Sequence, residues 1–164
     1  SEFSKDANEI TDIVQDTWLR TEYDTARSQA VAGEQFRGMR ENADLYPYWQ
    51  YLETISEHPR EDHLALVGLV FKIGDPEGDQ CFPPNGFNCG CSSEQVDDLY
   101  LQDNNLTPLS NAEAKEFLDK EIDPQFRFNP ADQGILPKES HSYFQVLPSA
   151  NSANYKLFSK DEDI

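Results

Sequence analysis

The chain has 164 residues, of which 13 are Lys or Arg and 31 are Asp or Glu, so its formal net charge is −18. This length suits one domain with its own core, and the lack of a long apolar run excludes a transmembrane helix. The basic residues are scattered and form no stripe that could displace counterions from a phosphate backbone, which argues against direct binding of DNA or RNA.

The ends of the chain differ in composition from its middle. Residues 1–3, Ser-Glu-Phe, resemble a cloning scar and, without an initiator Met, predict that the chain is a piece of a longer protein. Residues 149–164 are rich in Ser, Asn and acids and predict a loosely ordered acidic tail. The three cysteines are an odd number, so they do not make a disulfide framework, and reduced thiols with a metal option fit better.

The first predicted element is a long helix from residue 5 to about residue 33. Apolar residues recur there at a spacing of three to four, and no proline interrupts them. Acids gather near its start and arginines later, as the helix dipole favours. Gly33 or Gly38 is the predicted end of this helix.

Two strands with a short helix between them follow. The aromatic segment 46–54 predicts a strand with Trp49 and Tyr51 on one face. Residues 69–73, Leu-Val-Phe-Lys-Ile, predict a second strand beside it, and residues 59–66 predict a short helix. These segments favour a small, mostly antiparallel sheet.

The next part of the chain is rich in turn signals. Residues 75–79, Asp-Pro-Glu-Gly-Asp, predict a loop, and Pro-Pro-Asn-Gly at residues 83–86 predicts a rigid turn. Residues 93–101 are compatible with either a polar strand or a short helix.

A second convincing helix is expected near residues 111–122. Ser110 followed by Glu113 makes a capping box at its start, and Pro124 stops it. Residues 143–147 predict a last strand. The predicted fold class is therefore α+β, with the long N-terminal helix packed on a small antiparallel sheet and the second helix near residues 111–122.

A histidine and three cysteines form a candidate metal site. Cys89 and Cys91 lie two apart, so both sulfurs can face one ion, and Gly90 lets the backbone fold closely around it. His63 is the third predicted ligand, and Cys81 is the fourth if the proline turn carries it back. Zinc is the ion that this donor set favours. The alternative is a set of free thiols that are buried or merely neighbouring, with His63 satisfied by an ordinary hydrogen bond.

The case for an enzyme is weak, and no small-molecule substrate is expected. A thiolate near an imidazole is the core of a cysteine nucleophile, but a proline turn is not the helix N-terminus where such a cysteine commonly sits. Asp75, Glu77 and Asp79 alternate as in a calcium loop, but the glycine is misplaced and no terminal Glu follows. The chain also has no phosphate loop, nucleophile elbow or HExxH motif.

Five motifs follow one another along residues 10–130: Arg20-Thr21-Glu22, Pro47-Tyr48-Trp49-Gln50-Tyr51, Arg60-x-x-His63 ahead of Gly68, Pro83-Pro84-Asn85-Gly86-Phe87-Asn88-Cys89-Gly90-Cys91 and, more weakly, Phe128-Asn129-Pro130. Together they resemble the phage Mu protein F-like family of minor head proteins, which act in head morphogenesis. The resemblance implies that residues 4–148 form a minor head protein domain.

The resemblance also implies a role and partners. It implies a low-copy head protein that associates with the portal or other head proteins and acts in capsid assembly and in genome packaging or delivery. Its expected location is the virion interior or the bacterial cytoplasm, with no membrane partner. DNA contact has been proposed within the family, but the charge of this chain argues against it.

Two other functions remain open. The first is a toxin-like enzyme, such as a nuclease carried by a phage protein, whose chemistry would lie in residues 106–164. Its candidate residues are Lys120, Arg127, Lys138, His141 and Tyr143. The second is a zinc-stabilised binding domain with an unrelated role.

Overall fold

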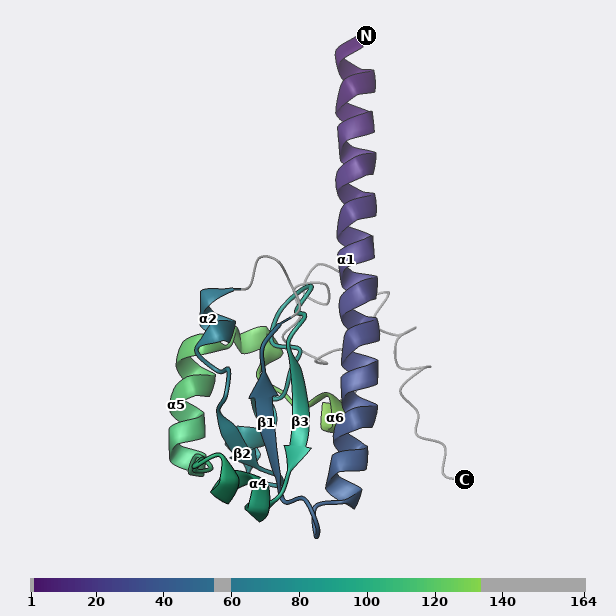
Figure 1. Ribbon diagram of the computed structural model, residues 1–164. Coiled ribbons are helices and arrows are strands. Elements are labelled where there is room, and N and C mark those ends of the chain that lie inside the picture. Colours follow the sequence, from purple (N-terminus) through teal and green to yellow (C-terminus); the bar gives the residue numbers. More distant parts are fainter. Residues whose placement is uncertain (1, 55–59, 134–164) are drawn as a thin grey trace, which may run out of the picture.

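The computed structural model describes residues 2–54 and 60–133. In this part of the chain, a three-stranded antiparallel sheet lies between the long helix α1, next to β3, and the helix α5 on the other side (Figure 1). The α+β fold class is therefore confirmed. The predicted strand at residues 143–147, the tail at 149–164 and residue 1 lie outside the described residues.

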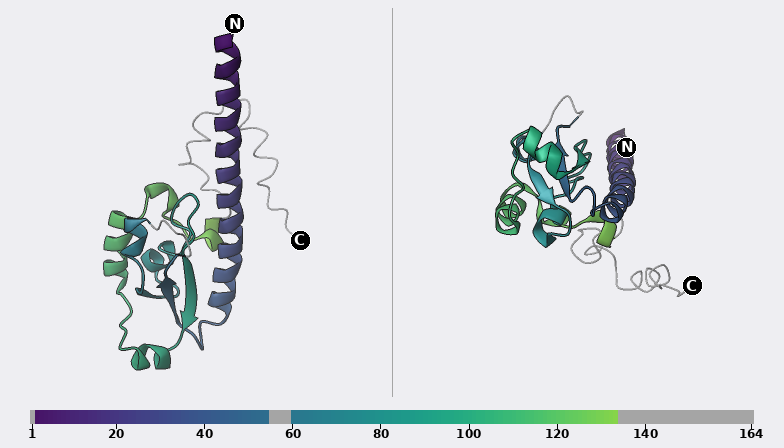
Figure 2. Two further views of the ribbon diagram at one scale, coloured as in Figure 1. Left: turned by 45° about the horizontal axis from the view of Figure 1, so that its top comes forward. Right: turned by 60° about the horizontal axis from the view of Figure 1, so that its bottom comes forward.

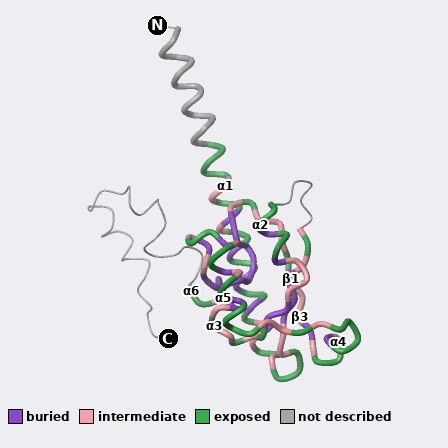
Figure 3. Tube along the Cα trace, turned by 90° about the vertical axis from the view of Figure 1, so that its left-hand side faces the viewer, coloured by how far each residue is buried: buried purple, intermediate pink, exposed green. Residues whose placement is uncertain are grey.

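Helix α1, Glu2–Glu41, has 40 residues and is longer at both ends than predicted. Its first half projects past the rest of the domain as a straight rod, which two further views confirm (Figures 1 and 2). Among residues 16–41 of this helix, for which burial is described, the buried ones occur where the later turns lie against the body (Figure 3). The predicted ends at Gly33 and Gly38 are wrong. The helix instead ends after Glu41, where the side chain of Asn42 donates to the carbonyl of Gly38.

Gly33 has a packing role that its sequence neighbourhood does not reveal. A Cβ at this position would lie 2.9 Å from the carbonyl oxygen of Pro130, which begins the short helix α6, Pro130–Gln133. The missing side chain therefore allows α6 to pack closely on α1. Gly38 has nothing within 4 Å of such a Cβ.

The sheet has the strand order β2-β1-β3, with β1 at its centre. Strand β1 covers Tyr48–Leu52, β2 covers Val70–Lys72 and β3 covers Ser92–Val96. The predicted pairing of the first two strands is confirmed, with Trp49 opposite Phe71. β3 pairs antiparallel on the other side of β1.

The core is built around the aromatic side chains of β1. Trp49 and Tyr51 are both fully buried on the same face of the strand, as the alternation predicted. Trp49 stacks on Phe71 with ring centroids 4.4 Å apart and meets Phe82 edge-on at 5.1 Å. Phe36 of α1 packs against Phe82 at 4.6 Å, so the helix and the sheet share one core.

The predicted loop at residues 75–79 is wrong, because most of it lies in the short helix α3, Pro76–Gln80. Pro76 takes the first helical position, where its missing N–H costs nothing. The Asp79 carboxylate accepts from the backbone N–H of Gly74 at 3.0 Å and contacts Arg40 of α1 at 3.0 Å. These contacts join α3 to α1.

The remaining helices agree more closely with the sequence. Residues 93–101 were expected to form either a strand or a short helix. They contain parts of both, since β3 is followed by α4, Asp98–Asp103. Helix α5 covers Asn111–Glu121 and begins with the predicted capping box at Ser110. A single 3₁₀ turn, Pro124–Phe126, follows it, and the short helix α2 covers Glu61–Leu64. No helix among the described residues is both long and apolar enough to cross a membrane.

Candidate metal centre

The central strand β1 holds the proline turn in place through a buried hydrogen bond. Asn85 is 1% exposed, and its amide donates to the carbonyls of Cys81 and Phe82 at 3.2 and 3.4 Å. Its side-chain oxygen accepts a hydrogen bond of 2.8 Å from the buried hydroxyl of Tyr51. After the turn, the backbone N–H of Asn88 donates to the hydroxyl of Thr25 on α1. The segment that carries the cysteines is thus fixed to both β1 and α1.

Helix α2 brings His63 to the same turn. His63 is 4% exposed, although histidine is on average only intermediate in burial. Arg60, at the start of α2, lies over Gly86 and donates to the carbonyl of Phe87 at 2.9 Å. A side chain at Gly86 would collide with this guanidinium and would touch the imidazole of His63. The Arg-x-x-His step and the glycine of the turn therefore fit one another.

The histidine and two of the three cysteines converge. The Nδ1 atom of His63 lies 3.5 Å from Sγ of Cys89 and 3.6 Å from Sγ of Cys91. The three ligand atoms all lie within 4.8 Å of one another, and both cysteines are half-buried. The structure therefore brings together three of the four predicted metal ligands.

The fourth predicted ligand, Cys81, is not part of this group. Its side chain is fully buried, with Sγ 3.5 Å from the carbonyl oxygen of Glu77 and 3.7 Å from that of Ala114. Burial raises the pKa of this thiol to about 12. The sequence prediction failed here because α3, which was expected to be a loop, directs Cys81 towards α5.

The two half-buried thiols influence each other's protonation. The pKa of Cys89 lies well below its usual range, because Cys91 donates a hydrogen bond to its sulfur and His63 does the same. The pKa of Cys91 is raised, first by its hydrogen bond to Cys89 and then by burial. The hydrogen bond with Cys89 also raises the pKa of His63. The pair thus favours one thiolate and one thiol in contact with the imidazole.

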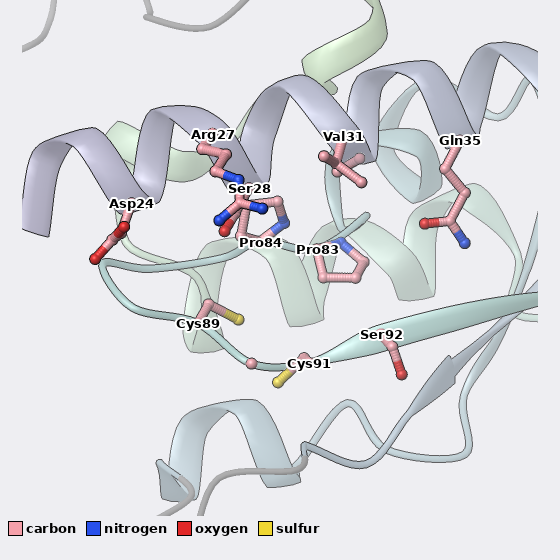
Figure 4. Close-up of a pocket in the computed structure, with 12 residues that line it drawn as sticks. Asp24, Arg27, Ser28, Val31, Gln35, Pro83, Pro84, Cys89, Cys91 and Ser92 are labelled. Carbon is pink, nitrogen blue, oxygen red and sulfur yellow. The ribbon is translucent and has the colours of Figure 1, made fainter.

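A groove of about 440 Å³ lies between α1 and the segment of residues 83–92 (Figure 4). Asp24 and Arg27 of α1 lie at one end of it and Gln35 at the other, with Pro83 facing Val31 between them. Cys89 and Cys91 belong to the wall opposite α1. The sulfur of Cys91 points away from α1, towards the side where α2 lies.

The residues suggested for a nuclease do not form a site in the described part of the chain. Lys120 pairs with Glu121 at 2.7 Å, and Arg127 pairs with Asp119 at 3.1 Å and donates to the carbonyl of Ile122. These are ordinary surface interactions around α5. Lys138, His141 and Tyr143 lie outside the described residues.

Sequence reasoning missed one charged cluster. Arg40 of α1 contacts Asp79 of α3 at 3.0 Å and Asp132 of α6 at 2.9 Å. Asn129 supports it by donating to the carbonyl of Asp79 at 2.8 Å. The Phe-Asn-Pro motif was a usable signal for Asn129, but nothing local in the sequence pairs an arginine with acids 39 and 92 positions away. This cluster joins the helices α1, α3 and α6 to one another.

Comparison with known proteins agrees with the motifs. A family model described as Phage Mu protein F like protein matches residues 1–94. The chain belongs to this family. The matched residues run from α1 into β3, so they contain His63, Cys89 and Cys91 and the first four motifs, whereas the Phe-Asn-Pro motif lies beyond them.

Two curated relatives have similar sequences. The putative capsid assembly protein F of Escherichia phage Mu is 35% identical over 89 residues, which cover 51% of this chain and 20% of that protein. The Mu-like prophage FluMu F protein of Haemophilus influenzae is 32% identical over 88 residues, which cover 54% of this chain and 21% of that protein. The chain thus spans about a fifth of the length of these relatives. No solved structure matches it.

Proposed function

We propose that this chain is a non-catalytic interaction module of a phage or prophage minor head protein. It associates with the portal or with other head proteins and acts in capsid assembly and in genome packaging or delivery. It works in the bacterial cytoplasm during assembly or in the virion interior. The observation that carries the proposal is the family match over residues 1–94, which takes in the long helix and the Pro83–Cys91 motif together.

The names of the relatives support the assembly role, since the phage Mu protein is described as a putative capsid assembly protein. The net charge of −18 supports a protein partner over a nucleic acid. An acidic surface attracts a basic surface of another protein and speeds their encounter more than it raises the final affinity. A basic face on a portal or head protein is therefore the kind of partner that this chain suits.

The non-catalytic role is supported by the chemistry of the described residues. Two of the basic side chains proposed for a nuclease, Lys120 and Arg127, are engaged in surface ion pairs, as described above. Tyr51 is held by Asn85 in the core, and the proline turn that carries the thiols beside His63 is not the helix N-terminus where a catalytic cysteine commonly sits.

A pull-down from cells that express the portal and head proteins of the same phage tests the proposal. We expect the immobilised chain to retain the portal or a head protein at low salt and to retain less of it at about 0.5 M salt, because screening weakens charge attraction. An unrelated acidic protein of similar size and net charge is the matched control and should retain neither. Equal retention by the control, or no retention of either partner, would contradict the proposal.

A further inference from the structure

The contacts of His63 fit a bound ion. The Nδ1 atom of an imidazole carries either one hydrogen or one lone pair, so it makes one straight hydrogen bond. Here the same nitrogen lies 3.5 Å from Sγ of Cys89 and 3.6 Å from Sγ of Cys91. Hydrogen bonding accounts for one of these two nearly equal contacts, whereas an ion between the three atoms accounts for both.

The distances fit a tetrahedral zinc ion. Zinc lies about 2.0–2.1 Å from an imidazole nitrogen and about 2.3 Å from a thiolate sulfur. At the tetrahedral angle these bond lengths place nitrogen and sulfur about 3.5 Å apart and the two sulfurs about 3.8 Å apart. The observed nitrogen–sulfur distances match, and the two sulfurs lie within 4.8 Å of each other.

The donor set also selects the ion. Two thiolates and an imidazole are ligands that zinc prefers, whereas calcium and magnesium require oxygen. A divalent cation also balances the negative charge of two thiolates in a half-buried position.

We infer that His63, through Nδ1, and Cys89 and Cys91, through their sulfurs, supply three of the four ligands of one zinc ion that ties helix α2 to the entrance of strand β3. These are the ligands that the described residues supply. Cys81 is excluded by its position against the carbonyls of Glu77 and Ala114, and Tyr51 by its hydrogen bond to Asn85. The ion stabilises the fold, because α2 has only four residues and no side-chain cap at its start.

Elemental analysis of the purified chain, reduced and freed of loose metal, tests this inference. We expect about one zinc per chain in the parent protein and less than about 0.2 in Cys89→Ser, Cys91→Ser and His63→Gln, since each removes one ligand. Cys81→Ala is the matched control, because it removes a thiol outside the group, and it should keep the full zinc content. Chelation should lower the melting temperature of the parent and of Cys81→Ala, but not that of the three ligand variants.

Cobalt(II) binding keeps the test decisive if a ligand variant fails to fold. Added to metal-free parent protein, cobalt(II) should give a thiolate-to-metal charge-transfer band and the intense visible bands of a tetrahedral site. Zinc should displace it at one equivalent. Parent protein without zinc and without these bands would overturn the inference, as would folded ligand variants that keep their zinc. The test is independent of the head assembly role, since metal content and portal retention can fail separately.

Discussion

The hydroxyl of Tyr51, in the middle of the central strand, donates a hydrogen bond of 2.8 Å to the side-chain oxygen of Asn85 in the proline turn. The two residues are 0% and 1% exposed, so water does not compete for this bond. Burial raises the pKa of the Tyr51 hydroxyl far above its usual range, and the hydroxyl remains a donor at any physiological pH. The bond links the fold's core to the segment that carries Cys89 and Cys91.

Replacement of Tyr51 tests the strength of this link. Tyr51→Phe leaves the buried Asn85 oxygen without its donor, so we expect a loss of about 1–3 kcal/mol in the free energy of unfolding. Asn85→Ala should cost at least as much, because the carbonyls of Cys81 and Phe82 then also lose a donor. Urea denaturation measures both losses. Tyr23→Phe, at a tyrosine that is 69% exposed on α1, is the control and should change stability by less than about 0.5 kcal/mol.

Two glycines in α1 are expected to respond to alanine with opposite signs. Gly33→Ala would place a Cβ 2.9 Å from the Pro130 carbonyl oxygen, which is backbone, so α6 must move and stability should fall by about 1–3 kcal/mol. Gly38→Ala meets nothing within 4 Å and should raise stability by about 0.5–1 kcal/mol, since alanine favours a helix more than glycine does. Thermal unfolding of both variants checks the signs. Equal effects would show that Gly33 does not serve the packing of α6.

Arg40 is expected to be the most important charge of the domain. Arg40→Met leaves the Asp79 carboxylate, whose side chain is 8% exposed, without its cationic partner, and we expect a loss of about 3 kcal/mol at neutral pH. Arg37→Met is the matched control. It breaks the exposed pair with Glu34 and a long hydrogen bond of 3.4 Å to the carbonyl of Ala131, both at the surface, so it should cost less than about 1 kcal/mol.

The pH dependence of this variant follows from the carboxyl group. Burial already raises the pKa of Asp79 despite the opposing contact with Arg40, and removing the arginine raises it further. An acid whose pKa is higher in the folded state destabilises the fold when ionised and ceases to do so once protonated. The stability difference between Arg40→Met and the parent should therefore shrink as the pH falls through the raised pKa that Asp79 has in the variant. A stability difference that grows in acid would contradict this account of the contact between Arg40 and Asp79.

The thiols should separate into two reactivity classes in metal-free protein. Cys81 is fully buried with a pKa of about 12, so very little thiolate is present at pH 8 and reaction with a thiol reagent should await unfolding. Cys89 is half-buried with a lowered pKa and should react quickly, whereas the raised pKa of the half-buried Cys91 should make it react slowly. Ellman's reagent should count one fast thiol in the parent and also in Cys81→Ala, but none in Cys89→Ser. Three fast thiols in the folded parent would show that Cys81 is accessible.

Much of this protein is encoded in short stretches of sequence. The alternation at Trp49 and Tyr51 predicted a strand with both side chains on one face, and Ser110 with Glu113 predicted the start of α5. These predictions succeeded because each depends on residues within a few positions of one another, which contact each other once the local structure forms. The prediction that Cys89 and Cys91 lie close together also depends on neighbouring positions alone.

The tertiary structure decided which residues far apart in the sequence contact each other. It made Gly33 a contact site for α6 instead of a helix end, turned Cys81 towards α5 and set Arg40 between two acids from other helices. It also brought His63 to two cysteines 26 and 28 positions away. Such pairs form only when the whole core packs, because the free energy that selects them comes from burying many residues together and not from the neighbours of any one residue.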